Sequence, residues 1–313
     1  MLIRTVTTVS ALNSAGQVVE ALPVREAATG ETDIVGRPVT PIDVVEDANG
    51  VPVRFVTGKS AVNSAGQVVD SIAVKGGWTP LQLGASLLAW WTADRSDLLT
   101  LNGSAVTSWK DVVAGHDAVQ GVSAARPIYS PTSFGGVPGL TFDGVDDELT
   151  CTNPASLAAL PSGSSPSEIW MVVQQDALGT DTGIRHALGY GGISASDRRA
   201  IVRSSVAGVS RGQVQFGDGS ANFTSGIAGG AIQSRHVIRG IYASDGGTCE
   251  VDGSAGSKAA AVPATGASRL RIGGSTAGGF FWNGKIRDSI ITSPLTTDQA
   301  TALRTYLLAR RML

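Results

Sequence analysis

The stretch that most constrains the fold is residues 139–150, GLTFDGVDDELT, which fits a strand, a tight turn and a second strand. Leu140 and Phe142 alternate with other residues and would point to one face, as in a half-buried strand. An Asp-Gly pair supplies the turn, and Leu149 resumes the apolar pattern beyond it. The spacing predicts an antiparallel hairpin, and therefore a β-rich fold.

The composition favours an all-β protein with many turns. Of 313 residues, 40 are glycine and only 16% are charged, and the formal net charge is −2. A near-neutral chain without a basic run argues against nucleic acid as a partner. The longest apolar run, residues 87–91, is too short to span a bilayer, so we predict no membrane insertion.

The start of the sequence lacks the charged residues and the continuous apolar core of a signal peptide. We therefore expect synthesis in the cytoplasm without export. Two cysteines, Cys151 and Cys249, are too few for a disulfide framework or a cysteine metal site. We expect both to be small buried thiols.

Residues 1–75 contain four copies of a short repeat. The segments ALNSAGQVVEALPV (11–24) and AVNSAGQVVDSIAV (61–74) are nearly identical, and residues 33–42 and 47–56 align with them on a glycine. Asn or Asp starts a turn, glycine accepts the positive φ that closes it, and the valines that follow favour a strand. Each copy is therefore predicted to form a hairpin or a strand–turn–strand unit.

The repeats are poor in core-forming residues, so we expect them to need stacking or a partner. Two prolines lie two residues after the repeat glycine, where a central strand would need an N–H donor, and this indicates edge strands. We predict that residues 1–75 form an attachment or oligomerisation module, with a small autonomous spacer as the alternative. The predicted assembly residues are Pro38, Pro52, Gly16 and Gly66.

Residues 76–81, which include Gly, Thr and Pro, are predicted to be a linker to a second domain over residues 82–313. Several short motifs of that domain occur in a fixed order. This succession resembles the laminin-G-like, concanavalin A-like jelly-roll modules of phage and bacterial surface proteins. The resemblance implies an antiparallel β-sandwich (jelly roll), with function on its concave face or its rim loops. The motifs are AWWTAD (89–94), VTSWKD (106–111), HDA (116–118), RPIY (126–129) and FDGVDD (142–147).

The remaining segments fit such a sandwich. EIWMVVQQ (168–175) predicts a strand that crosses the core. RHVIRGIYAS (235–244), followed by TCEVDG (248–253), resembles a hairpin of the same modules.

A short C-terminal helix is predicted to close the chain. Thr296 and Gln299 have the spacing of a capping box. Arg304, Arg310 and Arg311 are expected on the solvent side of the helix. The apolar residues that share the opposite face are Ala300, Leu303 and Leu307.

No catalytic signature was found in the sequence, such as a nucleophile elbow, a zinc-protease helix or a phosphate-binding loop. Jelly-roll glycosidases carry a strand of the form E-x-D-x-x-E, which supplies both carboxylates. Residues 250–255, EVDGSA, match its first half, but Ala255 stands where the second glutamate should be. Because the proton donor is missing, we predict that the protein is not an enzyme.

Calcium is the one cofactor for which the sequence offers ligands. Modules of the family it resembles often hold one Ca²⁺ between rim loops, using carboxylates and carbonyls. Asp143, Asp146 and Asp147 cluster in a single turn and are the predicted ligands. The alternative is that these carboxylates only cap the turn.

Glycan binding would need exposed aromatic rings. Trp282 lies beside a predicted turn, Tyr190 precedes a Gly-Gly pair, and Trp78 lies in the linker. These three are the predicted glycan-contacting residues.

Together these features predict a non-enzymatic phage virion surface protein, either a tail fibre, a spike or a capsid decoration. Its repeats would bind capsid or tail proteins and associate as a homotrimer. Its second domain would bind a host surface polysaccharide or decorate the particle. The alternative is a carbohydrate-binding module or glycosidase of bacterial origin.

Overall fold

The computed structural model divides into two compact units, Met1–Trp78 and Thr79–Leu313, and each is described by itself. In the first unit the described residues are 7–12, 18–25, 44–46, 52–53, 55–56, 60–62, 68–71 and 78. In the second they are 79–312, apart from 114, 177–182, 193, 195–196, 207–208, 218–221, 229–233 and 267. Among these residues no helix is long and apolar enough to cross a membrane.

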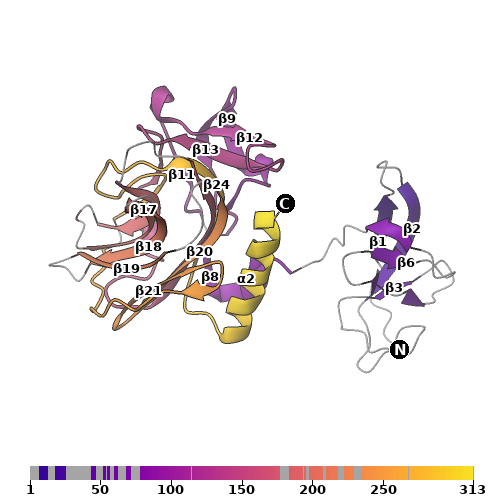
Figure 1. Cartoon of the computed structure of the whole chain (residues 1–313). Coiled ribbons are helices and arrows are strands. Elements are labelled where there is room, and N and C mark those ends of the chain that lie inside the picture. The colour runs from indigo at the N-terminus through magenta and orange to yellow at the C-terminus, as the bar shows by residue number, and fades with distance from the viewer. Residues whose placement is uncertain are drawn as a thin grey trace. The chain divides into compact units, whose positions relative to one another are not determined.

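The first unit confirms hairpins for the two most similar repeats. Leu12 pairs with Val18 in one copy, and Val62 pairs with Val68 at the same position of the other. The strands form a sheet ordered β1-β2-β3-β4 and a sheet ordered β5-β6-β7 (Figure 1). Their bounds are β1 Thr7–Leu12, β2 Val18–Arg25, β3 Val44–Glu46, β4 Pro52–Val53, β5 Phe55–Val56, β6 Ser60–Val62 and β7 Val68–Ser71.

Of the predicted assembly residues, the structure describes only Pro52. It begins β4, which is the last strand of its sheet, where a missing N–H donor is tolerated. Gly16, Pro38 and Gly66, and the repeat at residues 33–42, lie outside the described residues. The attachment role of this unit stays a prediction.

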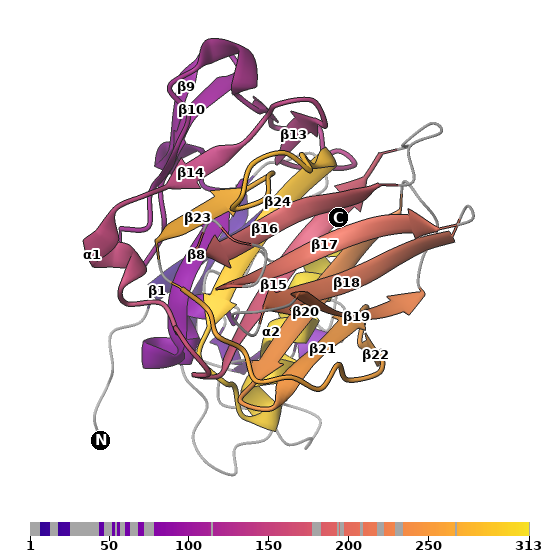
Figure 2. The same cartoon turned by 90° about the vertical axis from the view of Figure 1, so that its left-hand side faces the viewer.

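The second unit is a β-sandwich of two antiparallel sheets, which confirms the predicted fold class (Figure 2). One sheet, called the helix-covered sheet, is ordered β21-β20-β15-β24-β8. The other, called the second sheet, is ordered β14-β23-β16-β17-β18-β19. The bounds in the helix-covered sheet are β21 Gly246–Val251, β20 Arg235–Ala243, β15 Ser167–Gln175, β24 Asn283–Thr292 and β8 Leu87–Thr92. Those in the second sheet are β14 Leu149–Cys151, β23 Arg269–Ile272, β16 Ile184–Gly191, β17 Arg198–Val206, β18 Val209–Gly217 and β19 Asn222–Ala228.

Short strands join the two sheets along one side, because β13 pairs with β24 and β11 pairs with β14. These linking strands are β9 Leu99–Asn102, β10 Ala105–Trp109, β11 Ala118–Val119, β12 Ile128–Ser130 and β13 Gly139–Asp143. The remaining elements are β22 Ser254–Ala255, the helices α1 Pro154–Leu157 and α2 Thr297–Met312, and three 3-10 turns at Pro80–Ser86, Ser96–Leu98 and Ser123–Ala125.

The core lies between the two sheets and follows the alternation of the strands. In β15, Ile169, Met171 and Val173 belong to the core cluster and are completely buried. Leu188 in β16 and Ile201 in β17 belong to the same cluster. Burial of side chains of this size contributes roughly 1.5–3 kcal/mol each.

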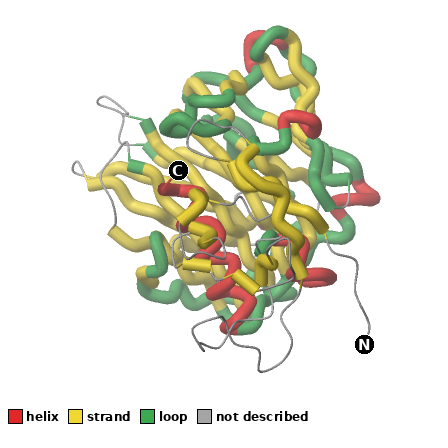
Figure 3. The backbone as a smooth tube through the Cα atoms, turned by 90° about the vertical axis from the view of Figure 1, so that its right-hand side faces the viewer, coloured by secondary structure: helices red, strands yellow, loops and turns green. Residues whose placement is uncertain are grey.

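Helix α2 covers the other face of the helix-covered sheet, as Figures 1 and 3 show. Its predicted capping box is present, since the Thr296 N–H donates to Gln299 Oε1 at 3.0 Å and the Gln299 N–H donates to Thr296 Oγ1 at 3.3 Å. The predicted solvent position of Arg310 is wrong. This residue is buried because its Nε donates to Asp288 Oδ2 at 2.7 Å on the underlying sheet. The predicted apolar face is buried as expected, at Ala300, Leu303 and Leu307.

Candidate functional site

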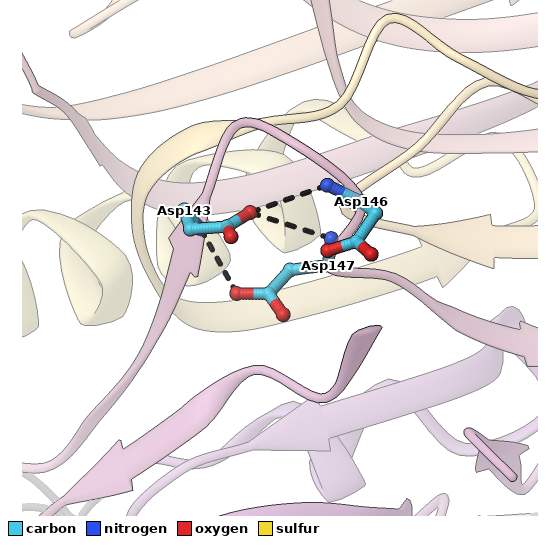
Figure 4. Close-up of side chains that lie close together, drawn as sticks. All are labelled: Asp143, Asp146 and Asp147. Atoms are coloured by element: carbon cyan, nitrogen blue, oxygen red, sulfur yellow. Dashed lines mark hydrogen bonds between the residues drawn. The ribbon is translucent and has the colours of Figure 1, made fainter. Parts of the chain in front are cut away.

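The predicted acidic cluster lies in the turn that follows β13 (Figure 4). Asp143 Oδ1 accepts backbone N–H bonds from Val145 at 2.8 Å, from Asp146 at 3.3 Å and from Asp147 at 3.4 Å. In return, the Asp143 N–H donates to Asp147 Oδ2 at 2.9 Å. Carboxylate oxygens of the three aspartates lie within 4.8 Å of one another.

These bonds give the cluster a structural role that needs no metal. Asp147 is only 5% exposed, and its burial together with the charges of Asp143 and Asp146 raises the pKa of its carboxyl to about 6. Calcium usually takes six to eight oxygen ligands, and one oxygen of Asp143 already accepts three backbone amides. The geometry therefore fits a capped turn, and calcium binding here stays a prediction.

Two of the three predicted glycan-contacting rings are enclosed by the protein. Trp282 and Tyr190 are completely buried in the core cluster, so neither presents a face to solvent. The Tyr190 hydroxyl lies 2.9 Å from Ser167 Oγ inside the sandwich. Trp78 is partly exposed. The expected exposure of Trp282 and Tyr190 is wrong, because a residue next to a turn can still direct its side chain inward.

The exposed aromatic ring in this region belongs instead to Phe280, two residues before Trp282. Phe280 is 53% exposed and has a φ of +54°, a conformation that costs a non-glycine residue about 1–2 kcal/mol. Its ring lies 5.8 Å from the ring of His186. The preceding Gly278 and Gly279 also have positive φ and are the sequence signal for this irregular turn.

Phe280 belongs to residues 273–282, called the strap, which connect β23 to β24. The strap lies against the second sheet on the face that points away from the core. A Cβ added to Gly189 of β16 would be 3.7 Å from Thr276 Cγ2 of the strap. The His186 N–H of the same strand donates to the Phe280 carbonyl at 2.9 Å. Ser275 and Thr276 are completely buried by this contact.

Strand register determines which side chains share this outer face. Directly paired residues of antiparallel strands point to the same side of a sheet. Gly191 in β16 pairs with Arg198 on one side and with Arg269 on the other. In the next row, Gly189 pairs with Arg271 of β23. Three arginines therefore surround two glycines under the strap.

The hydrogen bonds of Arg198 and Arg269 go to neutral oxygens. Arg198 Nη1 donates to Ser275 Oγ at 2.7 Å, and its Nη2 donates to Gln215 Oε1 at 3.1 Å. Arg269 Nη1 donates to the Thr276 carbonyl at 3.2 Å. Because Arg198 is only 5% exposed, burial lowers the pKa of its guanidinium.

Polar atoms under the strap are left without hydrogen-bond partners. They include Arg198 Nε, Thr276 Oγ1 and His186 Nδ1, all on residues that are at most 5% exposed. Burial, together with the positive charge of Arg198, lowers the pKa of His186 to about 3, so the ring is neutral at physiological pH. Most buried polar groups in native proteins are paired, so this concentration is unusual.

At the edge of this area Arg271 Nη1 donates to Glu148 Oε2 at 2.6 Å. Both side chains are partly exposed, and burial raises the pKa of the Glu148 carboxyl. The outer face thus combines an exposed ring, an accessible ion pair and a group of arginines of which Arg198 is buried.

No family model and no curated protein matches the sequence. Among solved structures, the chain is similar to a Trypanosoma rangeli sialidase at 19% identity and a TM-score of 0.48, over 73% of this chain and 33% of the sialidase. It is also similar to the CBM40 module of a Ruminococcus gnavus IT-sialidase bound to α2,6-sialyllactose. That match has 13% identity and a TM-score of 0.42, over 53% of this chain and 96% of the module. The chain spans about a third of the length of the first sialidase.

These comparisons correct two predictions. The two similar structures named above are a sialidase and a carbohydrate-binding module, and they give no support to a virion surface function, which is therefore not retained. The prediction that the protein is not an enzyme is not retained either, because sialidases are enzymes. Of the functions derived from the sequence, the alternative of a carbohydrate-binding module or glycosidase agrees better with these similarities.

Proposed function

We propose that the protein binds carbohydrate on the outer face of the second sheet, at the strap. The observation that carries this proposal is the exposed ring of Phe280 beside a polar surface. Sugars present an apolar C–H face that packs on aromatic rings, and hydroxyl groups that need polar partners at its edge. Both kinds of contact are present around the strap.

The polar partners come from the neighbouring strands. The pair Arg271–Glu148 offers donors and an acceptor that are partly open to solvent. Hydrogen bonds in which one partner is charged are shorter and stronger than neutral ones. A sugar stacked on Phe280 would therefore find hydroxyl partners within the same sheet face.

Backbone strain at Phe280 supports a role of its ring in binding. Strained conformations persist where the surrounding structure enforces them, and they cluster at binding sites. Here the φ of +54° falls on a phenylalanine and follows two glycines that already have positive φ. Glycine would adopt this conformation without strain, yet the chain carries an exposed aromatic ring there.

The experiment is a binding screen of the full chain against a panel of immobilised oligosaccharides, followed by titration calorimetry. Phe280→Gly removes the ring and relieves the strain, so the fold should be retained. Affinity should fall about five- to tenfold, as expected for one lost ring contact. Val262→Ala is the matched control, because Val262 is a 59% exposed apolar residue outside the strap.

Reducing-sugar release measured on the same samples reports whether a bound glycan is also cleaved. If no glycan of the panel binds, or if Phe280→Gly and Val262→Ala bind equally, the proposed site is wrong.

A further inference from the structure

On the outer face of the second sheet, Arg198 and Arg269 form no ion pair within 4.0 Å with a described carboxylate, and the charges of Asp197 and Glu148 act on them from farther away. Arg198 donates to Ser275 Oγ and Gln215 Oε1, and Arg269 donates to a backbone carbonyl. By contrast, neighbouring Arg271 forms an ion pair with Glu148 at 2.6 Å. Arg198 is 5% exposed, whereas Arg269 is only partly buried. A buried arginine such as Arg198 is normally paired with a carboxylate, because an unpaired buried charge is unfavourable.

The two guanidinium groups belong to one patch of the sheet. Arg198 and Arg269 lie on either side of Gly191, in strands β17 and β23. Neighbouring strands are about 4.8 Å apart, so the two α-carbons are roughly 10 Å apart. Long side chains that extend from the same face at this separation can both reach one small group between them.

The strap places its own oxygens where such a group would bind. Ser275 Oγ accepts from Arg198 at 2.7 Å, and the Thr276 carbonyl accepts from Arg269 at 3.2 Å. These neighbouring oxygens resemble the two oxygens of an anion, but they carry no net charge. Arg198 Nε and Thr276 Oγ1 are left without a partner inside the contact. The strap therefore satisfies the arginines only in part.

We propose that Arg198 and Arg269 form a subsite for an anionic substituent of the bound sugar, a carboxylate or a sulfate, and that the strap closes this subsite when it is empty. The inference rests on the proposed carbohydrate function and specifies its ligand class. An entering anion replaces the Ser275 hydroxyl and the Thr276 carbonyl as acceptor. The exchange is favourable because an anion adds the attraction between opposite charges to hydrogen bonds that the guanidinium groups now make with neutral oxygens.

The strap has a backbone suited to this movement. Gly273, Gly278 and Gly279 all have positive φ, and Phe280 is held in the same strained region. Residues 275–279 can move between these glycines while Trp282, completely buried, keeps the end of the strap anchored. The ring of Phe280 remains next to the subsite and contacts the same sugar.

The test uses matched pairs of glycans that differ only in charge. The probes are oligogalacturonides with free carboxylates and their methyl esters, and a sulfated oligosaccharide with its unsulfated parent, titrated into the full chain. We expect the charged member of a pair to bind about tenfold more tightly than its neutral partner, as one additional charged hydrogen bond would provide. Preference for the carboxylate or for the sulfate identifies the source of the charge, and either one supports the subsite.

Arg198→Gln and Arg269→Gln should reduce this preference to less than about twofold while the neutral partner binds as before. Arg126→Gln is the matched control, because Arg126 lies outside the strap and, among the described residues, donates to the carbonyls of Gln120 and Gly121. If an arginine variant does not fold, Ser275→Ala provides the second test. This substitution removes the Ser275 hydroxyl, which competes with the anion for Arg198. The charged probe should therefore bind several-fold more tightly, and the neutral probe should be unaffected.

Hydrogen exchange distinguishes an anion-binding role of Arg198 and Arg269 from a purely structural role. Saturation with the charged probe should accelerate exchange of the Ser275 amide, which bonds to the Gly279 carbonyl at 3.1 Å in the closed strap. Equal binding of charged and neutral probes, or a preference that survives both arginine substitutions, would overturn the subsite and leave the proposed carbohydrate function intact. If neither member of any pair binds, both proposals are wrong.

Discussion

Lowering the pH from 7.5 to 5.0 should destabilise the sandwich through His186. The ring is 1% exposed and Nδ1 has no hydrogen-bond partner, so the charged form is poorly accommodated in the folded state. Burial, with a smaller contribution from the charge of Arg198, lowers its pKa from 6.5 to about 3. In the unfolded chain the same imidazole takes up a proton near its ordinary pKa.

The sign follows from this difference between the two states. A lowered pKa in the folded state means that the stabilisation is complete above pH 6.5 and is lost progressively as the pH falls toward 3. Each pH unit in that interval costs about 1.4 kcal/mol, so about 2 kcal/mol is lost by pH 5. This is a large share of the roughly 5–15 kcal/mol that stabilises a folded domain.

The assay is urea denaturation of the wild type and of His186→Gln at pH 7.5, 6.0 and 5.0. Carboxylates elsewhere titrate in both proteins, so the quantity of interest is the difference in unfolding free energy between the two. That difference should shift by about 2 kcal/mol in favour of the variant between pH 7.5 and pH 5. Parallel pH profiles would refute the reasoning, because they would show that His186 can be protonated within the fold without cost.

Three further predictions concern charged groups in the second unit. Arg310→Ala should cost about 3–5 kcal/mol in urea denaturation, because it leaves the completely buried Asp288 without its guanidinium partner; a loss below 1 kcal/mol would contradict this. Arg199→Met should change stability by less than about 1 kcal/mol or increase it, because Arg199 is completely buried and its hydrogen bonds to described residues go to neutral oxygens such as Ser167 Oγ at 2.6 Å. A loss above 3 kcal/mol would show that those bonds outweigh its desolvation. If calcium binds the turn after β13, millimolar Ca²⁺ should raise the melting temperature of the wild type and not that of Asp146→Ala; no shift in the wild type would dismiss the site.

The sequence predicted the sheets well because strand alternation and turn residues are local properties. The strand predicted at residues 168–175 is β15, Ser167–Gln175, and its alternate residues Ile169 and Met171 lie in the core as expected. The capping box that begins α2 is equally local, and it formed as predicted.

The site was harder to predict because it depends on which faces are covered. Period-two alternation identifies the two faces of a strand, but it cannot tell whether the second face is open to solvent. Trp282 was expected to be exposed because it lies beside a turn, yet it is buried. The positive φ of Phe280 interrupts the alternation that would otherwise put both rings on the same side. The prediction for Arg310 failed for a related reason, since its buried partner Asp288 comes from a strand of the underlying sheet.

The two covered faces of the sandwich differ in how their charges are satisfied, and this difference indicates where a ligand would bind. Two arginines of α2 form ion pairs with the sheet below, Arg304 with Glu250 and Arg310 with Asp288, so positive charges meet carboxylates. A helix fixed by such pairs is costly to lift. Under the strap, Arg198 and Arg269 meet only neutral oxygens in the described part of the chain. Of these two covers, the strap is the one that an anionic ligand could displace with a gain in attraction between opposite charges.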